Sequence, residues 1–285
     1  MIGYLDMTQE SVTSWPLALL LLLAGVAGLL WGGHLLVEGA VAIARRMGMP
    51  SLLIGLTIVA FGTSAPELAL NTVAAANGET GLAFGNVIGS NIANIGLVLG
   101  LTALVTAIPV TSKLFLTGGF PWLLVVTLAA MGLPWIGSGV DGEPGYARWA
   151  GLVLLCLAPV TAWLWYCDSK KASTPSITVE QEVEAAPARG LGMAWLLVIG
   201  GLVLLISGGK STEVGAVSLA RWIGISEAVI GLSIVAVATS LPEVVTALIA
   251  ARRGEPDLAM GTVIGSNLFN LALVLGMTSL ISPVV

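Results

Sequence analysis

The sequence predicts an all-α integral membrane protein in which one helical unit occurs twice in opposite orientations. The 285-residue chain is 56% hydrophobic and only 9% charged, whereas a soluble domain carries about 25% charged residues. Its apolar residues form long continuous runs, and two segments separated by 176 residues share more than half of their residues. A chain of this composition cannot cover a water-facing surface, so we expect the lipid bilayer to surround it.

Eight apolar runs are long enough to cross the membrane, because a spanning helix needs about 20 apolar residues. Because the runs are continuous rather than alternating over short segments, we expect helices and not a β-barrel. The short links Asn77–Glu79 and Gly254–Asp257 predict antiparallel helical hairpins. The predicted helices cover residues 16–44, 51–76, 81–107, 114–134, 147–167, 193–219, 227–251 and 257–281.

A polar segment rich in Ser, Lys, Glu and Pro divides the chain into two halves. We expect residues 1–167 to hold five helices and the first copy of the repeat, and residues 193–285 to hold three helices and the second copy. Residues 168–192 then form a cytoplasmic linker. The N-terminal segment lacks the basic region of a signal peptide, so the first run is expected to remain as a spanning helix.

Basic residues in the loops predict the orientation of the chain. If the N-terminus lies outside, only Arg148 and Arg221 fall on the outer side, and the other loop Lys and Arg residues face the cytoplasm. We therefore expect a multi-pass protein of the cell inner membrane whose partner is lipid, with no nucleic acid bound. The predicted cytoplasmic residues are Arg45, Arg46, Lys113, Lys170, Lys171, Arg189, Arg252 and Arg253.

The internal repeat is strong enough to indicate a function class. Gly48–Gly100 and Gly224–Gly276 align without a gap and share 28 of 53 residues. Five predicted helices separate equivalent positions, and an odd number reverses the direction, so the second copy is inverted. Inverted repeats with a binding site at their interface are typical of secondary transporters.

The best-matched stretches of the two copies carry polar residues deep inside apolar runs. Glu67 and Asn94 lie about 15–20 Å from the turn that joins their helices, at 1.5 Å per residue. This depth is near the membrane midplane, and the inversion places Glu243 and Asn270 at a similar depth from the opposite side. The matched stretches are Gly62–Glu67 with Ala238–Glu243, and Gly89–Asn94 with Gly265–Asn270.

A carboxylate at this depth costs a few kcal/mol and requires a cation, a proton or a basic partner. Lys210 is the only nearby basic residue, so a cation or a proton is the simplest partner. Pro66 and Pro242 lack an N–H and release the carbonyls of the residues four positions earlier. All candidate ligands are hard oxygens, which suit Ca²⁺, Na⁺ or Mg²⁺. The side-chain oxygens beside the glutamates come from Thr63, Ser64, Ser90, Asn94, Thr239, Ser240, Ser266 and Asn270.

Other interpretations of these residues remain open. Small and hydroxyl residues also line ordinary helix contacts in membranes, and the two glutamates could be protonated and paired. Asn91 and Asn267 flank the predicted site, where their role could be to tie helices together. His34 and Lys210 are equivalent positions that we expect to snorkel or to meet Glu38 and Glu213.

These motifs resemble those of the cation/calcium exchanger superfamily and are most similar to its prokaryotic sodium/calcium antiporters. The pattern there is a duplicated Gly-Thr-Ser-x-Pro-Glu followed by Gly-Ser-Asn-x-x-(Asn or Asp). The resemblance implies ten helices, a central diamond-shaped cation site, and sliding of the first and sixth helices past a core. It implies that Glu67 and Glu243 bind Ca²⁺ with the backbone at Thr63 and Thr239. For Na⁺ it adds Ala60, Ala236, Ser64, Ser240, Ser90 and Ser266.

Two departures from the family pattern affect the expectation. Asn270 stands where members with a well-described sodium site often carry Asp, so the site holds two carboxylates and not three. The chain also ends after about eight transmembrane helices, without counterparts of the family's last two. A truncated sequence, or a further copy of the chain covering the exposed face, would explain this difference, so a homo-oligomer remains open.

The sequence therefore predicts a secondary antiporter, not an enzyme, that exports Ca²⁺ against Na⁺ and carries these ions as substrates without a resident cofactor. Ca²⁺/H⁺ exchange, exchange of another cation and a non-transporting homologue are the alternatives. A membrane enzyme with paired carboxylates is disfavoured, because such sites usually hold Asp-rich clusters near the membrane interface.

Overall fold

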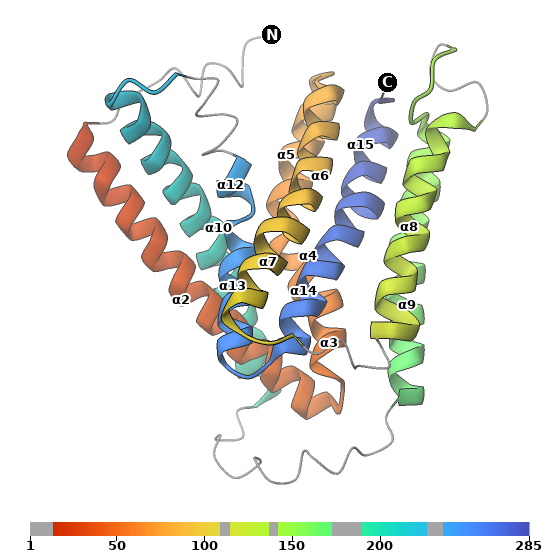
Figure 1. Ribbon diagram of the computed structural model, residues 1–285, viewed down its shortest axis with the longest axis horizontal. Helices are drawn as coiled ribbons and strands as arrows, with labels where there is room; N and C mark the ends of the chain where they lie inside the picture. The colour runs from red at the N-terminus through yellow and green to blue at the C-terminus, as the bar shows by residue number, and fades with distance from the viewer. Residues whose placement is uncertain (1–13, 109–114, 137–141, 173–189, 227–235, 285) are drawn as a thin grey trace.

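The chain folds into a bundle of long helices, shown in Figure 1 as a computed structural model. The structure describes residues 14–108, 115–136, 142–172, 190–226 and 236–284. Within these ranges the regular structure is helical, apart from one antiparallel bridge between Tyr146 and Val284. The predicted all-α class is therefore confirmed.

The helices follow the predicted apolar runs closely. The first copy contains α2 (Trp15–Met47), α3 (Ser51–Ile54), η1 (Gly55–Val59), α4 (Ala60–Thr63), α5 (Ala65–Ala76), α6 (Thr80–Ala93), η2 (Asn94–Leu99) and α7 (Gly100–Val105). The connecting part contains η3 (Phe115–Gly119), α8 (Phe120–Gly132), η4 (Leu133–Trp135) and α9 (Arg148–Ala172). The second copy contains α10 (Leu191–Trp222), α12 (Ala236–Thr239), α13 (Leu241–Arg252), α14 (Pro256–Phe269), η6 (Asn270–Val274) and α15 (Leu275–Ile281).

Length and hydropathy of the described helices agree with the predicted spans. Five continuous helices pass both criteria, and the bent pair Ser51–Thr63 and Ala65–Ala76 makes a sixth span. Phe120–Trp135 is a shorter apolar helix. The predicted helix at 227–251 is described only from Ala236 onward, and most of the predicted linker 168–192 lies outside the described residues.

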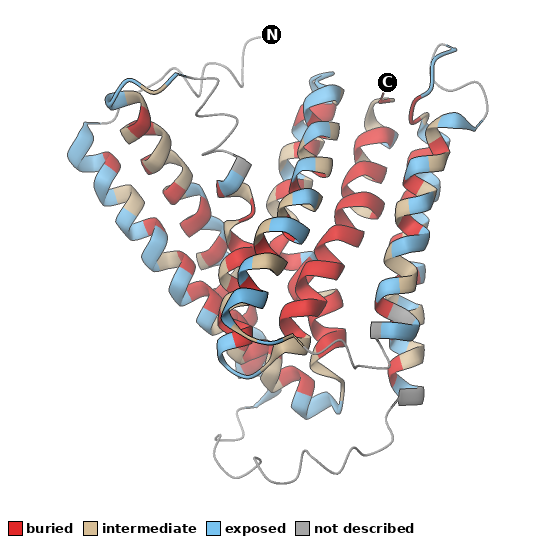
Figure 2. Ribbon diagram, in the orientation of Figure 1, coloured by how far each residue is buried: buried red, intermediate tan, exposed pale blue. Residues whose placement is uncertain are grey.

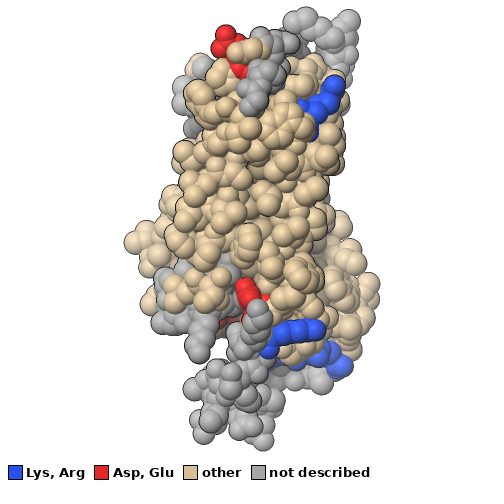
Figure 3. Space-filling view, turned by 90° about the vertical axis from the view of Figure 1, so that its right-hand side faces the viewer, with Lys and Arg blue, Asp and Glu red and all other residues tan. Residues whose placement is uncertain are grey.

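The surface is that of a protein surrounded by lipid. Large apolar side chains face outward along the helices, for example Leu104, which is 85% exposed, and Trp31, which is 72% exposed. On the face shown in Figure 3, acidic and basic residues gather at the two ends, and a broad uncharged band lies between them. This distribution matches a hydrocarbon core about 30 Å thick with charged regions on either side.

The two longest helices, α2 and α10, form a tilted pair at one side of the bundle (Figure 1). Small residues let their backbones touch. A Cβ atom added to Gly201 would lie 2.7 Å from the carbonyl oxygen of Gly32, and one added to Gly25 would lie 2.7 Å from that of Gly208. Such close approach through small residues is a common way for helices to associate in membranes.

These contacts show the inverted symmetry of the repeat directly. Because the two copies are offset by 176 residues, Gly25 of the first copy is equivalent to Gly201 of the second, and Gly32 is equivalent to Gly208. The contact between Gly25 and Gly208 is therefore the inverted counterpart of the contact between Gly201 and Gly32. The contact between Gly39 and Ala194 is related in the same way to that between Gly215 and Ala18. The two helices therefore exchange places under a pseudo-two-fold axis, as expected for inverted repeats.

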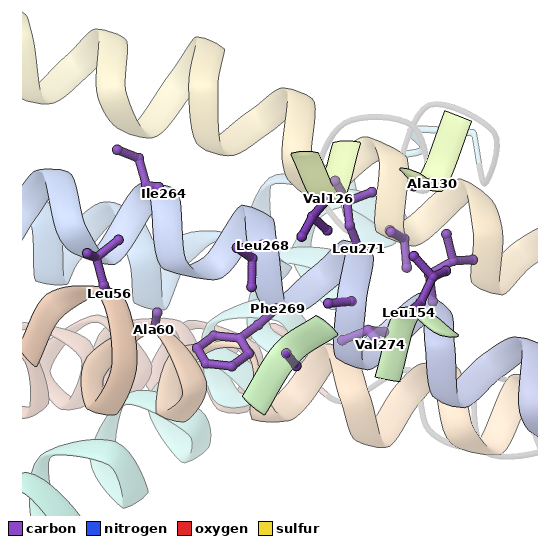
Figure 4. Packing of buried hydrophobic residues seen from close by; sticks show 14 of the residues in the cluster. Leu56, Ala60, Val126, Ala130, Leu154, Ile264, Leu268, Phe269, Leu271 and Val274 are labelled. Carbon is purple, nitrogen blue, oxygen red and sulfur yellow. The ribbon is translucent and has the colours of Figure 1, made fainter. Parts of the chain in front are cut away.

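The helix formed by α14, η6 and α15 lies at the centre of the bundle. Most of its residues are buried, and Figure 2 shows it as the most continuously buried element. Leu268 and Leu271 pack in one buried apolar cluster with residues of α8 and of the first copy (Figure 4). The rings of Phe61 and Phe269 meet edge to face, with 5.9 Å between their centroids. Gly261 and Gly265 bring the backbone of α14 against Leu52 and Leu56. The second copy thus packs directly on the first around the predicted site.

Candidate cation site

Two broken helices carry the glutamates into the centre of the protein. α4 ends at Thr63 and α5 begins at Ala65, with a bend of 44° between the two parts of the span. The residue at the break, Ser64, has φ −82° and ψ 1°, and its counterpart Ser240 has φ −91° and ψ 1°. The two copies therefore break in the same way. Pro66 and Pro242 predicted the interruption, and the structure places it two residues earlier.

Each glutamate lies in the first turn of the helix that follows its break. Backbone N–H groups at a helix N-terminus point toward this position and favour negative charge there. Glu67 is only 3% exposed and Glu243 only 1% exposed. The two carboxyl groups are near enough to interact electrostatically. The structure thus brings together the two glutamates that the inverted repeat predicted.

Asn94 and Asn270 also occupy equivalent irregular positions. Each begins a short π-helical segment, η2 or η6, inside an otherwise α-helical span. Such segments are uncommon and occur frequently at functional sites. Both asparagines are 1% exposed. The helical distortion and the buried amide therefore coincide in both copies.

Seven of the predicted site residues bury an oxygen atom that has no hydrogen-bond partner among the described residues. A buried polar atom without a partner usually costs about 1–3 kcal/mol, and a cluster of such atoms requires an explanation. Every one of these atoms is a hard oxygen of the kind that binds Ca²⁺ or Na⁺, which is the type of partner that the sequence predicted for them. The atoms are Ser64 Oγ, Glu67 Oε2, Ser90 Oγ, Asn94 Oδ1, Ser240 Oγ, Glu243 Oε2 and Asn270 Oδ1.

The remaining predicted residues lie on the same broken helices and on α14. The hydroxyls of Thr63 and Ser266 are 3.3 Å apart, which joins the first copy to the second. Thr63 also donates a hydrogen bond to the Ala60 carbonyl at 3.3 Å. Ala236 and Thr239 are the first and last residues of α12, which corresponds to α4 in the first copy.

Some polar residues next to this cluster were not in the predicted set. Thr246 lies on α13, one turn beyond Glu243, and its buried hydroxyl has no hydrogen-bond partner within the described ranges. The first copy has Leu70 at the equivalent position, so a comparison of the two copies does not point to Thr246 as a polar site residue. Asn91 links the two copies through two hydrogen bonds, as its flanking position suggested.

The two other polar positions within the long helices behave differently from each other. Lys210 Nζ lies 3.0 Å from Glu213 Oε1, as expected. His34 contacts Arg253, which was not among its expected partners, with 2.9 Å between His34 Nδ1 and Arg253 Nη2. The hairpin turn after α13 folds back against α2 and supplies this partner.

Comparison with known proteins agrees with the site and the fold. The family model described as "Sodium/calcium exchanger protein" matches residues 17–166 and 193–285. The putative antiporter CaxA of Alkalimonas amylolytica is 38% identical over 266 residues, covering 93% of this chain and 81% of that protein. The inner membrane protein YrbG of Escherichia coli K12 is 36% identical over 272 residues, covering 94% of this chain and 81% of that protein.

Two further relatives carry exchanger names. The sodium/calcium exchanger MaX1 of Methanosarcina acetivorans is 31% identical over 294 aligned positions, covering 93% of this chain and 83% of that protein. A solved structure of the sodium-calcium exchanger NCX_Mj, soaked with Na⁺ and Sr²⁺, superposes with a TM-score of 0.80 at 31% identity, covering 95% of this chain and 84% of that one. The chain therefore belongs to the sodium/calcium exchanger family of membrane cation antiporters.

Proposed function

We propose that this protein exchanges Ca²⁺ for Na⁺ across the cell inner membrane through a midplane site built around Glu67 and Glu243. One observation carries the proposal: both copies contribute buried oxygen atoms that have no hydrogen-bond partner in the part of the chain that the structure describes, and two of these atoms belong to carboxyl groups. Apolar packing alone would leave these atoms unsatisfied. A cation that enters and leaves the site gives them a function.

The chemistry of the ligands favours Ca²⁺ and Na⁺. Carboxylate, hydroxyl, amide and carbonyl oxygens are the ligands of hard cations, and Ca²⁺ accepts six to eight of them in flexible geometry. Two carboxylates neutralise one Ca²⁺ or two Na⁺. The relatives named as sodium/calcium exchangers support the same pair of ions. Thr63, Ser64, Ser90 and Asn94, with Thr239, Ser240, Ser266 and Asn270, would surround the ions, and Ala60 and Ala236 would add carbonyls for Na⁺.

The proposed orientation places the N-terminus outside. The end of α2 carries Arg45 and Arg46, and the end of α13 carries Arg252. Both ends then face the cytoplasm, as the positive-inside rule requires. The name of the Escherichia coli relative supports an inner-membrane location.

Calcium flux in reconstituted vesicles tests the proposed exchange. Vesicles loaded with Na⁺ should take up radioactive Ca²⁺ when the outside lacks Na⁺, and uptake should stop when the Na⁺ gradient is removed. Glu67→Gln should abolish this uptake, because it removes half of the fixed charge in the site. Full transport by Glu67→Gln would contradict the site assignment.

Ca²⁺/H⁺ exchange is the second candidate, and the neutral Asn270 favours it. With two carboxylates in place of three, the site carries less charge for binding several Na⁺ ions together. A pH gradient should then drive Ca²⁺ uptake in the same vesicles without Na⁺. A chain that shows no thermal stabilisation by Ca²⁺ in detergent would instead be a non-transporting homologue.

A further inference from the structure

Asn91 of α6 is hydrogen-bonded through both ends of its side-chain amide. Its Nδ2 donates to the backbone carbonyl of Asn267 at 3.2 Å. Its Oδ1 accepts from Nδ2 of Asn270 at 3.1 Å. Asn91 and Asn267 are equivalent residues of the two copies, separated by 176 positions. The contact therefore lies where the two repeats meet, beside the proposed cation site.

These two hydrogen bonds determine which atom each amide presents. A backbone carbonyl can only accept, so Asn91 must turn its nitrogen toward Asn267. The oxygen of Asn91 then faces Asn270 and can only accept, so Asn270 must turn its nitrogen toward Asn91. The oxygen of Asn270 remains, buried and without a partner among the described residues. Only this oxygen, and not the amide nitrogen, can bind a cation.

We propose that Asn91 is a positioning residue that holds the side-chain oxygen of Asn270 in the orientation required to bind Ca²⁺. The inference rests on the proposed function and extends it to a residue outside the predicted ligand set. Asn91 acts through Asn270 and does not itself contact the ion. A neutral ligand at position 270 needs such a partner, because an amide that rotates by half a turn exposes N–H groups to the cation.

The two copies differ at this point, which provides a matched control. Asn267 is the counterpart of Asn91, yet its side-chain oxygen has no partner among the described residues. Asn94, the counterpart of Asn270, is therefore not held in the same way. Removing the Asn267 side chain also keeps the backbone carbonyl that Asn91 uses. Asn91→Ala and Asn267→Ala thus make the same chemical change at equivalent positions, with different expected results.

Calorimetric titration of the purified full chain with Ca²⁺ measures the effect. Asn91→Ala should weaken Ca²⁺ binding about tenfold, as the loss of a residue that orients a metal ligand typically does. Asn267→Ala should change the affinity less than twofold. Equal affinities for the two variants would overturn the proposal, provided that wild type binds Ca²⁺. A wild-type chain that does not bind Ca²⁺ would instead overturn the proposed function, and the positioning role with it.

A double-mutant cycle separates positioning from a general structural role. If Asn91 acts through Asn270, Asn91→Ala should have no further effect on Ca²⁺ affinity in an Asn270→Ala background. A residue that only supports folding would weaken binding in both backgrounds, and that result would overturn the proposal. The cycle needs only chains that remain monodisperse in detergent.

A conservative variant gives an independent check. Asn91→Asp keeps an oxygen that accepts from Asn270, so Ca²⁺ affinity should recover to within threefold of wild type or exceed it. Asn267→Asp adds the same charge without a hydrogen bond to Asn270 and measures the contribution of charge alone. Two gains in Ca²⁺ affinity are compared: the gain from Asn91→Ala to Asn91→Asp, and the gain from Asn267→Ala to Asn267→Asp. The proposal requires the first gain to be larger than the second. Equal gains in the two comparisons would overturn it.

Discussion

Glu67 and Glu243 occupy equivalent places in helices that point in opposite directions. Each lies in the first turn after a break, one residue after a proline. The N-terminal ends of two half-helices therefore meet near one point, each with its own carboxyl group. This arrangement favours negative charge at the point where the two half-helices meet, as the proposed cation site requires.

At the residue scale, the two glutamates should contribute similarly to binding. Glu67→Gln and Glu243→Gln each remove one charge, and a unit charge 4 Å from another is worth about 4 kcal/mol at an effective dielectric constant of about 20. We expect each variant to lose at least about a hundredfold in Ca²⁺ affinity. Glu213→Gln is the matched control, because Glu213 pairs with Lys210 outside the site. A small effect at either site glutamate would contradict the shared site.

Asn270→Asp tests the significance of the neutral amide at the same scale. A third carboxylate should strengthen Ca²⁺ binding by about tenfold through its added charge. The gain should be larger at alkaline than at acidic pH, because protonation removes the added charge. Calorimetric titration at two pH values measures both effects. Weaker Ca²⁺ binding at alkaline pH would show that the charge at this position does not contact the ion.

At the scale of elements, the α2–α10 pair depends on glycines that recur every seven residues. Gly25, Gly32 and Gly39 on α2 face Gly201 and Gly208 on α10, together with Ala194. The contacts are so close that any side chain would force the helices apart. The pair can therefore behave as one rigid unit, as the resemblance to exchangers with sliding helices implies.

Two neighbouring glycines of α10 test this packing. A Cβ at Gly201 would lie 2.5 Å from the backbone nitrogen of Leu36, whereas a Cβ at Gly200 would meet no atom within 4 Å. Gly201→Ala should lose about 1–3 kcal/mol through overpacking. Gly200→Ala should be neutral or gain up to about 1 kcal/mol in helix propensity. Thermal unfolding in detergent compares the two, and equal unfolding temperatures would contradict the packing.

At the scale of the whole molecule, α2 is tied to the hairpin turn that joins α13 to α14. His34 contacts Arg253 at 2.9 Å, and Arg45 lies 3.9 Å from Glu255. Glu255 also accepts a hydrogen bond from Ser51 at 2.8 Å. If the α2–α10 pair slides during transport, the two contacts between α2 and this turn must break. The contact between Ser51 and Glu255 should persist.

Cross-linking through introduced cysteines tests this difference after Cys156 and Cys167 have been replaced. A thiol cross-link between His34→Cys and Arg253→Cys should stop Ca²⁺ flux reversibly, because it joins the moving pair to the rest of the bundle. The same reagent between Ser51→Cys and Glu255→Cys should leave most of the flux intact. Unchanged flux after a complete cross-link of the first pair would contradict movement of α2 past this turn.

The sequence alone predicted the helices and the central residues. Long apolar runs determine spanning helices, since the bilayer leaves no water to satisfy an exposed backbone. The repeat identified Glu67, Glu243, Asn94 and Asn270, because equivalent polar residues at midplane depth have no simple packing explanation. The ligand roles of these residues stay a prediction.

Three features were not predictable, because each depends on how neighbouring helices meet. They are the exact break at Ser64, the contact of His34 with Arg253, and the buried hydroxyl of Thr246 that finds no partner among the described residues.

What the sequence by itself determined is the class of protein, the spans, the inversion of the repeats and the two opposed glutamates. These features follow from hydropathy and from identity between the copies, which are properties of the chain alone. Only the tertiary structure decided that Asn91 is hydrogen-bonded through both its nitrogen and its oxygen. It also decided that, within the described residues, the side-chain oxygens of Asn267 and Asn270 have no hydrogen-bond partner. The two copies carry the same residues there, so the difference comes from the packing of one copy against the other.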